Sequence, residues 1–122
     1  MRLLLSLLCA LALSAGPAQG QSVQLLVQSS PLAGFRYGEG AELWPQMRRG
    51  DALELSREAD NPHDPNAVRV EWRGRKLGYV PRKDNAAIAW GLERGTPLRA
   101  RVSRLAEYPN RARRVEFEVY IE

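Results

Sequence analysis

Residues 57–82 read READNPHDPNAVRVEWRGRKLGYVPR, and their first part is a polar turn at residues 61–66. Pro62 and Pro65 each fix the backbone φ angle, and the asparagine and aspartate side chains between and around them can hydrogen-bond to their own backbone. The turn is therefore expected to be rigid. Because binding groups are commonly carried by loops that a rigid scaffold positions, this turn is the first candidate for a functional site.

Two strands are predicted directly after the turn. Val68, Val70 and Trp72 occupy every second position, so they are expected to share one buried face of a strand. Arg73 and Gly74 form a tight hairpin into a second strand at residues 75–80. On this pattern Trp72 is interpreted as a core residue, whereas Trp44 and Trp90 could lie either in the core or at the surface.

The rest of the chain continues the strand pattern around a single predicted helix. The helix is expected over residues 85–94, with Asp84 as its N-cap and Gly95 closing its C-terminus. Residues 42–48 could form a short helical turn or an irregular strap. Strands are expected at residues 22–28, around residues 53–55, from residue 98, and from residue 115 to the end. The order β-β-β-β-α-β-β predicts a mostly β fold, a small antiparallel OB-like β-barrel with one α-helix.

The first twenty residues have the pattern of a secretory signal peptide. Met1 and Arg2 supply a positive start, residues 3–13 are apolar, and residues 18–20 form a small-x-small cleavage site. The apolar run is too short to span a membrane, although an uncleaved N-terminal anchor is the alternative. We therefore expect a signal peptide at residues 1–20 and a domain at residues 21–122. The exported domain would be periplasmic or secreted and would not be attached to a membrane.

Composition argues against several kinds of chemistry. Cys9 lies inside the predicted leader, so the remaining domain would lack disulfides, thiol catalysis and cysteine-ligated zinc. His63 is the sole histidine, and neither a nucleophile motif nor a phosphate-binding glycine loop accompanies it, so we expect no enzyme, no cofactor and no metal site. Loss of Arg2 with the leader lowers the formal net charge from +4 to +3, which permits an anionic partner without requiring one.

Single-stranded nucleic acids are held by aromatic rings that stack on bases and by cations that follow the phosphates. The chain offers both kinds of group, in Tyr37 beside Arg36, in His63, and in Tyr79 near Arg82. Each aromatic also has a structural interpretation. Tyr37 could be a partly buried loop anchor, and Tyr79 could be a core residue with only its hydroxyl exposed.

The turn and the segment after it resemble a known family. The order Asn-Pro-x-Asp-x-Asn-Ala at residues 61–67, followed by a strand and then Gly-Tyr-Val-Pro-Arg at residues 78–82, is similar to the HIRAN domain. The resemblance covers residues 24–122. HIRAN domains occur at the N-termini of some SWI2/SNF2 helicase-like proteins and as lone domains in bacteria. The resemblance implies the same OB-like fold and a noncatalytic module that binds nucleic acid.

In that family the better-studied members bind the 3′ end of single-stranded DNA through an Arg-Tyr pair in the first loop and an aromatic-Asp pair in the turn. By position, the resemblance assigns Arg36 and Tyr37 to the first pair, and His63 and Asp64 to the second. It implies that Asp64 accepts a hydrogen bond from the terminal 3′ hydroxyl and would repel a 3′ phosphate. The alternative for Asp64 is that it only caps its own turn.

The predicted nucleic-acid-binding residues are Arg36, Tyr37, His63, Asp64, Tyr79 and Arg82. Two positions depart from the family pattern, because Gly38 stands where a second tyrosine is frequent and His63 stands where tyrosine is common.

The expected partner is thus single-stranded nucleic acid with a free 3′-OH end, bound by a monomer. Export is difficult to reconcile with a role beside a repair helicase. The alternative function is therefore a periplasmic or secreted interaction domain whose HIRAN-type pocket binds a protein or another anionic ligand.

Several arginines near the C-terminus are interpreted from the expected pairing of the last two strands. With a turn centred on residues 108–109, Arg101 would face Glu116 and Arg99 would face Glu118, which would neutralise that surface. The arginines at positions 111, 113 and 114 are less compensated and could flank a ligand groove.

Overall fold

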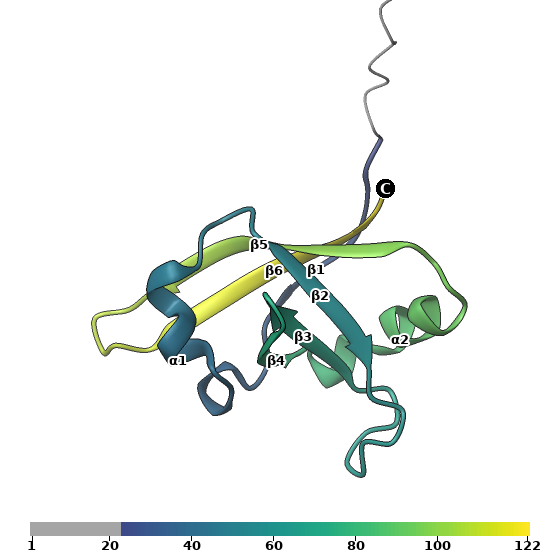
Figure 1. Cartoon of the computed structure of the whole chain (residues 1–122), viewed down its shortest axis with the longest axis horizontal. Helices are drawn as coiled ribbons and strands as arrows, with labels where there is room; N and C mark the ends of the chain where they lie inside the picture. The colour runs from purple at the N-terminus through teal and green to yellow at the C-terminus, as the bar shows by residue number, and fades with distance from the viewer. Residues whose placement is uncertain (1–22) are drawn as a thin grey trace, which may run out of the picture.

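The computed structural model of this protein describes residues 23–122, and six antiparallel strands dominate it (Figure 1). The strands follow the spatial order β1-β6-β5-β2-β3-β4. Their bounds are β1 Leu25–Pro31, β2 Ala52–Arg57, β3 Val68–Trp72, β4 Arg75–Tyr79, β5 Leu98–Glu107 and β6 Arg113–Ile121. The helical elements are η1 Phe35–Tyr37, α1 Gly40–Leu43, η2 Trp44–Gln46, η3 Arg82–Asp84 and α2 Ala86–Glu93. The mostly β, antiparallel architecture is as predicted.

The sheet is open, which corrects the prediction of a closed barrel. Its two end strands meet only at one bridge just after β1, where Ala33 and Tyr79 exchange two backbone hydrogen bonds of 2.9 Å. Gly78 permits this contact, because a Cβ at that position would lie 2.3 Å from the Ala33 carbonyl oxygen. The chain then turns away at Gly34, whose φ is +71°. Within residues 23–122, the pairing between the β1 and β4 ends of the sheet is therefore limited to this one bridge.

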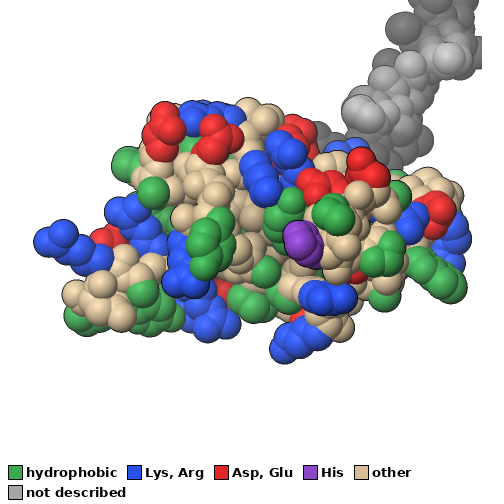
Figure 2. All heavy atoms as spheres, turned by 90° about the horizontal axis from the view of Figure 1, so that it is seen from below, with side chains coloured by type: hydrophobic (Ala, Val, Ile, Leu, Met, Phe, Trp, Pro, Cys, Tyr) green, Lys and Arg blue, Asp and Glu red, His purple; other side chains and the backbone are tan. Residues whose placement is uncertain are grey.

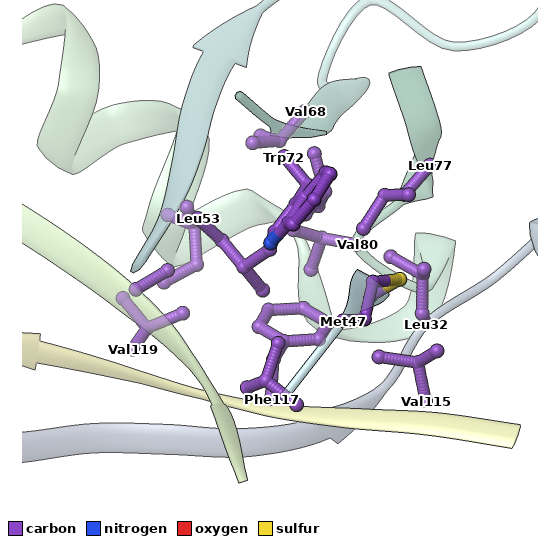
Figure 3. Close-up of a cluster of buried hydrophobic side chains, with 14 of the residues drawn as sticks. Leu32, Met47, Leu53, Val68, Trp72, Leu77, Val80, Val115, Phe117 and Val119 are labelled. Atoms are coloured by element: carbon purple, nitrogen blue, oxygen red, sulfur yellow. The ribbon is translucent and has the colours of Figure 1, made fainter. Parts of the chain in front are cut away.

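A buried apolar cluster fills the space enclosed by the sheet (Figure 3). Val68, Val70 and Trp72 are almost fully buried, which confirms the period-two prediction for β3 and the core assignment of Trp72. The indole Nε1 of Trp72 donates to Asp51 Oδ2 at 3.1 Å, so its polar atom is satisfied. Phe117 on β6 packs in the same cluster.

The helix is one residue shorter than predicted at each end. Asp84 lies in the turn η3, and Asn85 is the residue that precedes α2, so the predicted N-cap at Asp84 is wrong. The Asn85 side chain is used elsewhere, because it donates to Asp64. Gly95 follows the helix with a φ of +77°, as its predicted closing role requires. Trp90 on α2 is exposed, and Trp44 is partly buried against the core.

The first strand and the last hairpin also differ from prediction. β1 starts and ends three residues later than expected, because its pairing with β6 runs from Leu25 to Pro31. Val23 and Leu25 are exposed, whereas Ser30 is buried. In the hairpin Arg101 faces Glu118 and not Glu116, since the turn is centred near Asn110 and a bulge follows Val102. Arg101 nevertheless forms a salt bridge with Glu118 at 3.1 Å, and Arg99 with Glu122 at 2.9 Å.

The predicted signal peptide at residues 1–20 lies outside the described residues and stays a prediction, as does the start of the domain at residue 21. Within residues 23–122, no helix combines the length and apolar character needed to cross a membrane.

Candidate nucleic-acid interface

The turn at residues 61–66 is held by the side chain of Asn61. Its Oδ1 accepts the backbone N–H of His63 at 2.9 Å and that of Asp64 at 3.2 Å. Its Nδ2 donates to Glu58 Oε1 at 3.1 Å, which fastens the turn to the segment after β2. These bonds supply the rigidity that the two prolines predict.

Asp64 is the one carboxylate of the turn, and both of its oxygens accept hydrogen bonds. Its Oδ1 accepts the N–H of Asn66 at 2.9 Å, and its Oδ2 accepts Asn85 Nδ2 at 2.7 Å. These two hydrogen bonds, with the Arg82 guanidinium 4.0 Å away, hold the pKa of Asp64 below its ordinary value, although burial opposes them. Asp64 is therefore ionised at neutral pH and caps its own turn, as the structural interpretation of this residue proposed.

His63, Asp64, Tyr79 and Arg82 line one pocket of about 330 Å³, which we call the end pocket. Four of the six predicted residues are thus brought together. The full lining is Ala33, Asn61, His63, Asp64, Ala67, Tyr79, Val80, Arg82 and Asn85. Figure 2 shows the histidine (purple) at the surface of this face, with Lys and Arg side chains (blue) on both sides of it.

Tyr79 forms a wall of the end pocket, and its hydroxyl is already engaged. The hydroxyl donates to Glu58, with oxygen–oxygen distances of 3.0 and 3.3 Å, and Lys76 Nζ lies 4.4 Å from the centre of its ring. The Ala33 bridge fixes its backbone. The ring, and not the hydroxyl, is what Tyr79 can offer a ligand.

Arg36 and Tyr37 lie on η1 and do not line the end pocket. The Tyr37 side chain is 78% exposed, so the alternative of a partly buried loop anchor is wrong. The Arg36 guanidinium lies 4.7 Å from the centre of the Tyr37 ring and donates to the Tyr37 hydroxyl. Both side chains are exposed, and η1 begins two residues after Ala33, which lines the end pocket.

Close backbone packing explains why glycine follows Tyr37. A Cβ at Gly38 would lie 2.8 Å from the Leu77 carbonyl oxygen, so a second tyrosine would collide with β4. The next residue, Glu39, donates its N–H to the Lys76 carbonyl at 3.0 Å. Its carboxylate accepts two hydrogen bonds from Arg75, at 2.9 and 3.1 Å. Gly38 and Glu39 together fasten the loop that carries Arg36 and Tyr37 to β4.

Three residues that shape the site were not among the six predicted binding residues. Asn61 and Asn85 orient Asp64 and its turn, and Glu58 binds the Tyr79 hydroxyl. The Asn61 contacts are local and follow from turn chemistry. The Asn85 and Glu58 contacts each join residues 21 positions apart, so no local pattern could have indicated them.

The arrangement presents aromatic rings, cations and one fixed carboxylate on a small antiparallel β scaffold, which defines a β-sheet binding module. Within residues 23–122, no group of three or more His, Cys, Asp or Glu side chains is placed to hold a metal ion. The family profile of the HIRAN domain matches residues 25–122, so the chain belongs to the HIRAN domain family. HIRAN domains are known as DNA-binding modules, and membership supports nucleic-acid binding.

Two solved structures share the fold. A protein from Lactobacillus plantarum is 24% identical with a TM-score of 0.67, and the match covers 82% of this chain and 98% of that one. The HIRAN domain of human HLTF is 21% identical with a TM-score of 0.62, and the match covers 83% of this chain and 80% of that one. No curated protein sequence matches this chain.

Proposed function

We propose that this protein is a noncatalytic module that binds single-stranded DNA at an end with a free 3′ hydroxyl. The proposal extends the nucleic-acid binding that family membership supports. It is carried by one observation, the Asp64 carboxylate that Asn66 and Asn85 hold in the wall of the end pocket. With the predicted leader removed, the monomeric domain would act in the periplasm or outside the cell.

A carboxylate repels a polyanion, so its presence in a nucleic-acid site requires an explanation. A terminal hydroxyl provides one, because it can donate a hydrogen bond to the carboxylate. A carboxylate has about four acceptor positions, and the turn and Asn85 use two of those on Asp64. A 3′ hydroxyl can donate to one that remains. A 3′ phosphate carries no such donor when ionised and would meet a like charge, so it would be disfavoured.

Bases and phosphates have their own partners around this carboxylate. The exposed rings of His63 and Tyr37 can stack on bases, and each stacked base contributes about 1–3 kcal/mol. Arg82 is 77% exposed at the pocket rim, where its guanidinium can contact the phosphate that precedes the terminal nucleotide. The site thus combines end recognition with contacts that do not depend on sequence.

The test is fluorescence anisotropy with two labelled single strands that differ only in a 3′-OH or a 3′-phosphate end. We expect tighter binding of the hydroxyl end. Asp64→Asn should weaken that binding about tenfold, because a hydrogen bond to a charged acceptor contributes about 1.5–3 kcal/mol and one to a neutral acceptor about 0.5–1.5 kcal/mol. It should also remove the preference between the two ends. Asparagine preserves the turn, because its side-chain oxygen can still accept the Asn66 N–H, and its Nδ2 can donate to the Asn85 oxygen once the Asn85 amide has rotated.

Asp60→Asn is the matched control. Asp60 is exposed one residue before the turn, and its carboxylate forms no side-chain hydrogen bond or salt bridge within residues 23–122. This variant should bind both strands as the unmodified protein does. Equal affinity of the unmodified protein for the two ends would refute end recognition. Absence of binding to either would favour the alternative, an interaction domain for a protein or another anionic ligand.

A further inference from the structure

A second groove lies beside η1, on the side of the β5–β6 turn. It has a volume of about 210 Å³ and is lined by Phe35, Arg36, Ala41, Arg111, Ala112 and Arg113. Three of these six residues are arginines and none is acidic. We call it the arginine groove.

The guanidinium groups of this groove are largely uncompensated. Arg36 and Arg111 form no salt bridge within residues 23–122. Arg113 has a loose partner in Glu107 at 3.6 Å and lies 5.2 Å from the centre of the Trp44 ring. Arg101 on the same hairpin differs from these arginines, because a salt bridge with Glu118 neutralises its charge. The groove therefore concentrates positive charge where the neighbouring surface does not.

The turn that carries Arg111 is well ordered by its own hydrogen bonds. The Arg111 N–H donates to the Tyr108 carbonyl at 2.8 Å, and the Tyr108 N–H donates to the Ala112 carbonyl at 2.9 Å. Asn110 Oδ1 accepts the Ala112 N–H at 3.1 Å. These hydrogen bonds fix the backbone beside the groove. A phosphate bound there would therefore contact guanidinium groups that a rigid turn carries.

The arginine groove is close to the end pocket along the chain. Ala33 lines the end pocket and Arg36 lines the groove, and three residues span at most about 11 Å. The exposed Tyr37 ring follows directly. The β5–β6 turn forms the left end of the molecule in Figure 1, and in Figure 2 basic side chains lie at that end and also beside the histidine.

We propose that the arginine groove binds the phosphodiester backbone of the nucleotides on the 5′ side of the terminal one. The inference rests on the proposed function, because it requires the 3′ end to be held in the end pocket. A strand fixed there would pass over Tyr37 and place its next phosphates between Arg36 and the β5–β6 turn. The contacts would be charge-assisted hydrogen bonds from guanidinium to phosphate oxygen, which carry no sequence preference.

The experiment compares a thymidine dinucleotide with a strand of about twelve thymidines, a length within the range of OB-type sites, both ending in 3′-OH. The dinucleotide reaches only the end pocket, whereas the longer strand reaches both sites. Arg111→Gln should weaken binding of the longer strand about threefold to tenfold and leave the dinucleotide unchanged. It should also reduce the slope of log affinity against log salt for the longer strand by about 0.7.

Arg99→Gln is the matched control, because it removes one exposed charge at the opposite end of β5, about 26 Å from the turn. It should change neither affinity. If Arg111→Gln binds the longer strand as tightly as the unmodified protein, or if Arg99→Gln weakens it equally, the arginine groove has no specific role. If the unmodified protein binds neither strand, the proposed function itself fails, which is a separate result.

Discussion

At the residue scale, Asn61 is the side chain on which the shape of the turn depends most. One of its atoms accepts two backbone N–H groups, and its amide nitrogen binds Glu58. Through the N–H of Asp64 it fixes the carboxylate that the proposed function uses. Loss of Asn61 would therefore affect both the stability of the domain and the geometry of the end pocket.

We predict that Asn61→Ala lowers the free energy of unfolding by about 1–2 kcal/mol, because two backbone donors in a partly buried turn lose their acceptor. Urea denaturation followed by tryptophan fluorescence measures this change. Asn110→Ala is the control, since Asn110 Oδ1 accepts only one N–H in an exposed turn, so its loss should be smaller. An equal loss in both variants would mean that Asn61 has no special structural role.

Turn chemistry predicted which residues form the turn at residues 61–66, but not the distant residues that the site contacts through the fold. Asp64 capping its own turn and the rigidity of residues 61–66 both follow from local sequence. The contacts of Asp64 with Asn85 and of Tyr79 with Glu58 join segments that meet only in the fold. Asn85 was predicted to be the first residue of the helix, but it precedes α2 and its side chain donates to Asp64.

At the element scale, one cluster of charges joins η1 and α1 to the sheet. Arg75 on β4 donates to Glu39 on one side and to Glu42 on α1, at 2.9 Å, on the other. Glu39 also accepts the Lys76 N–H at 3.2 Å. The cluster thus ties the loop that carries Arg36 and Tyr37 to the strand that ends in Tyr79.

This cluster predicts a specific pH dependence. The hydrogen bonds from Arg75 lower the pKa of Glu39 below its ordinary value of 4.5, with burial opposing them. Glu39 therefore contributes stability above about pH 4.5, and that contribution is lost as pH falls through its lower folded-state pKa. Glu39→Gln should melt at a lower temperature than the unmodified protein at pH 7, and the difference should shrink as pH falls below 4.5.

Thermal melts followed by circular dichroism across this pH range measure the difference. Glu54→Gln serves as the control, because Glu54 is exposed on β2 and its side chain forms no salt bridge within residues 23–122. A melting difference for Glu39→Gln that stayed constant down to low pH would show that the carboxylate charge is not its source.

The elements with the clearest patterns were predicted best. β3 alternates between buried and partly buried residues, and Arg73 and Gly74, with φ of +48° and +79°, form the tight turn that follows it. The β5–β6 register was misplaced because the turn is centred on residue 110 and not on residues 108–109, a position that strand periodicity does not fix. β1 was misplaced because the apolar alternation that starts at Val23 resembles that of a half-buried strand, although Val23 is exposed and lies before β1.

At the scale of the whole molecule, the fold class could be predicted from the sequence, but the closure of the sheet and the pairing of the charges could not. The antiparallel β class followed from the strand pattern, whereas closure of the sheet depends on the course of the chain at Ala33 and Gly34. Charge counts alone suggested only a mildly basic protein. The fold pairs nine arginines with carboxylates, at positions 57, 69, 75, 82, 99, 101, 104, 113 and 114.

This pairing predicts a moderate salt dependence of DNA binding. Arg36, Arg82, Arg111 and Arg113 are the arginines that line the end pocket and the arginine groove, so about three or four phosphates should be contacted. Each phosphate contributes a slope of about −0.7 for single strands, which gives a total slope of about −2 to −3. Affinity for a 3′-OH strand of about twelve thymidines should therefore fall about 20- to 50-fold between about 50 and 200 mM salt.

Anisotropy titrations at several salt concentrations measure this slope. A steeper slope and a slope near zero would each contradict the prediction, for different reasons. A slope steeper than about −5 would require more phosphate contacts than the two sites provide, so binding would spread over the basic surface without a defined path. A slope near zero would mean that phosphates are not contacted, and recognition would then rest on the terminal nucleoside alone. Only the intermediate slope fits a 3′ end held by Asp64 with its strand continuing along the arginine groove.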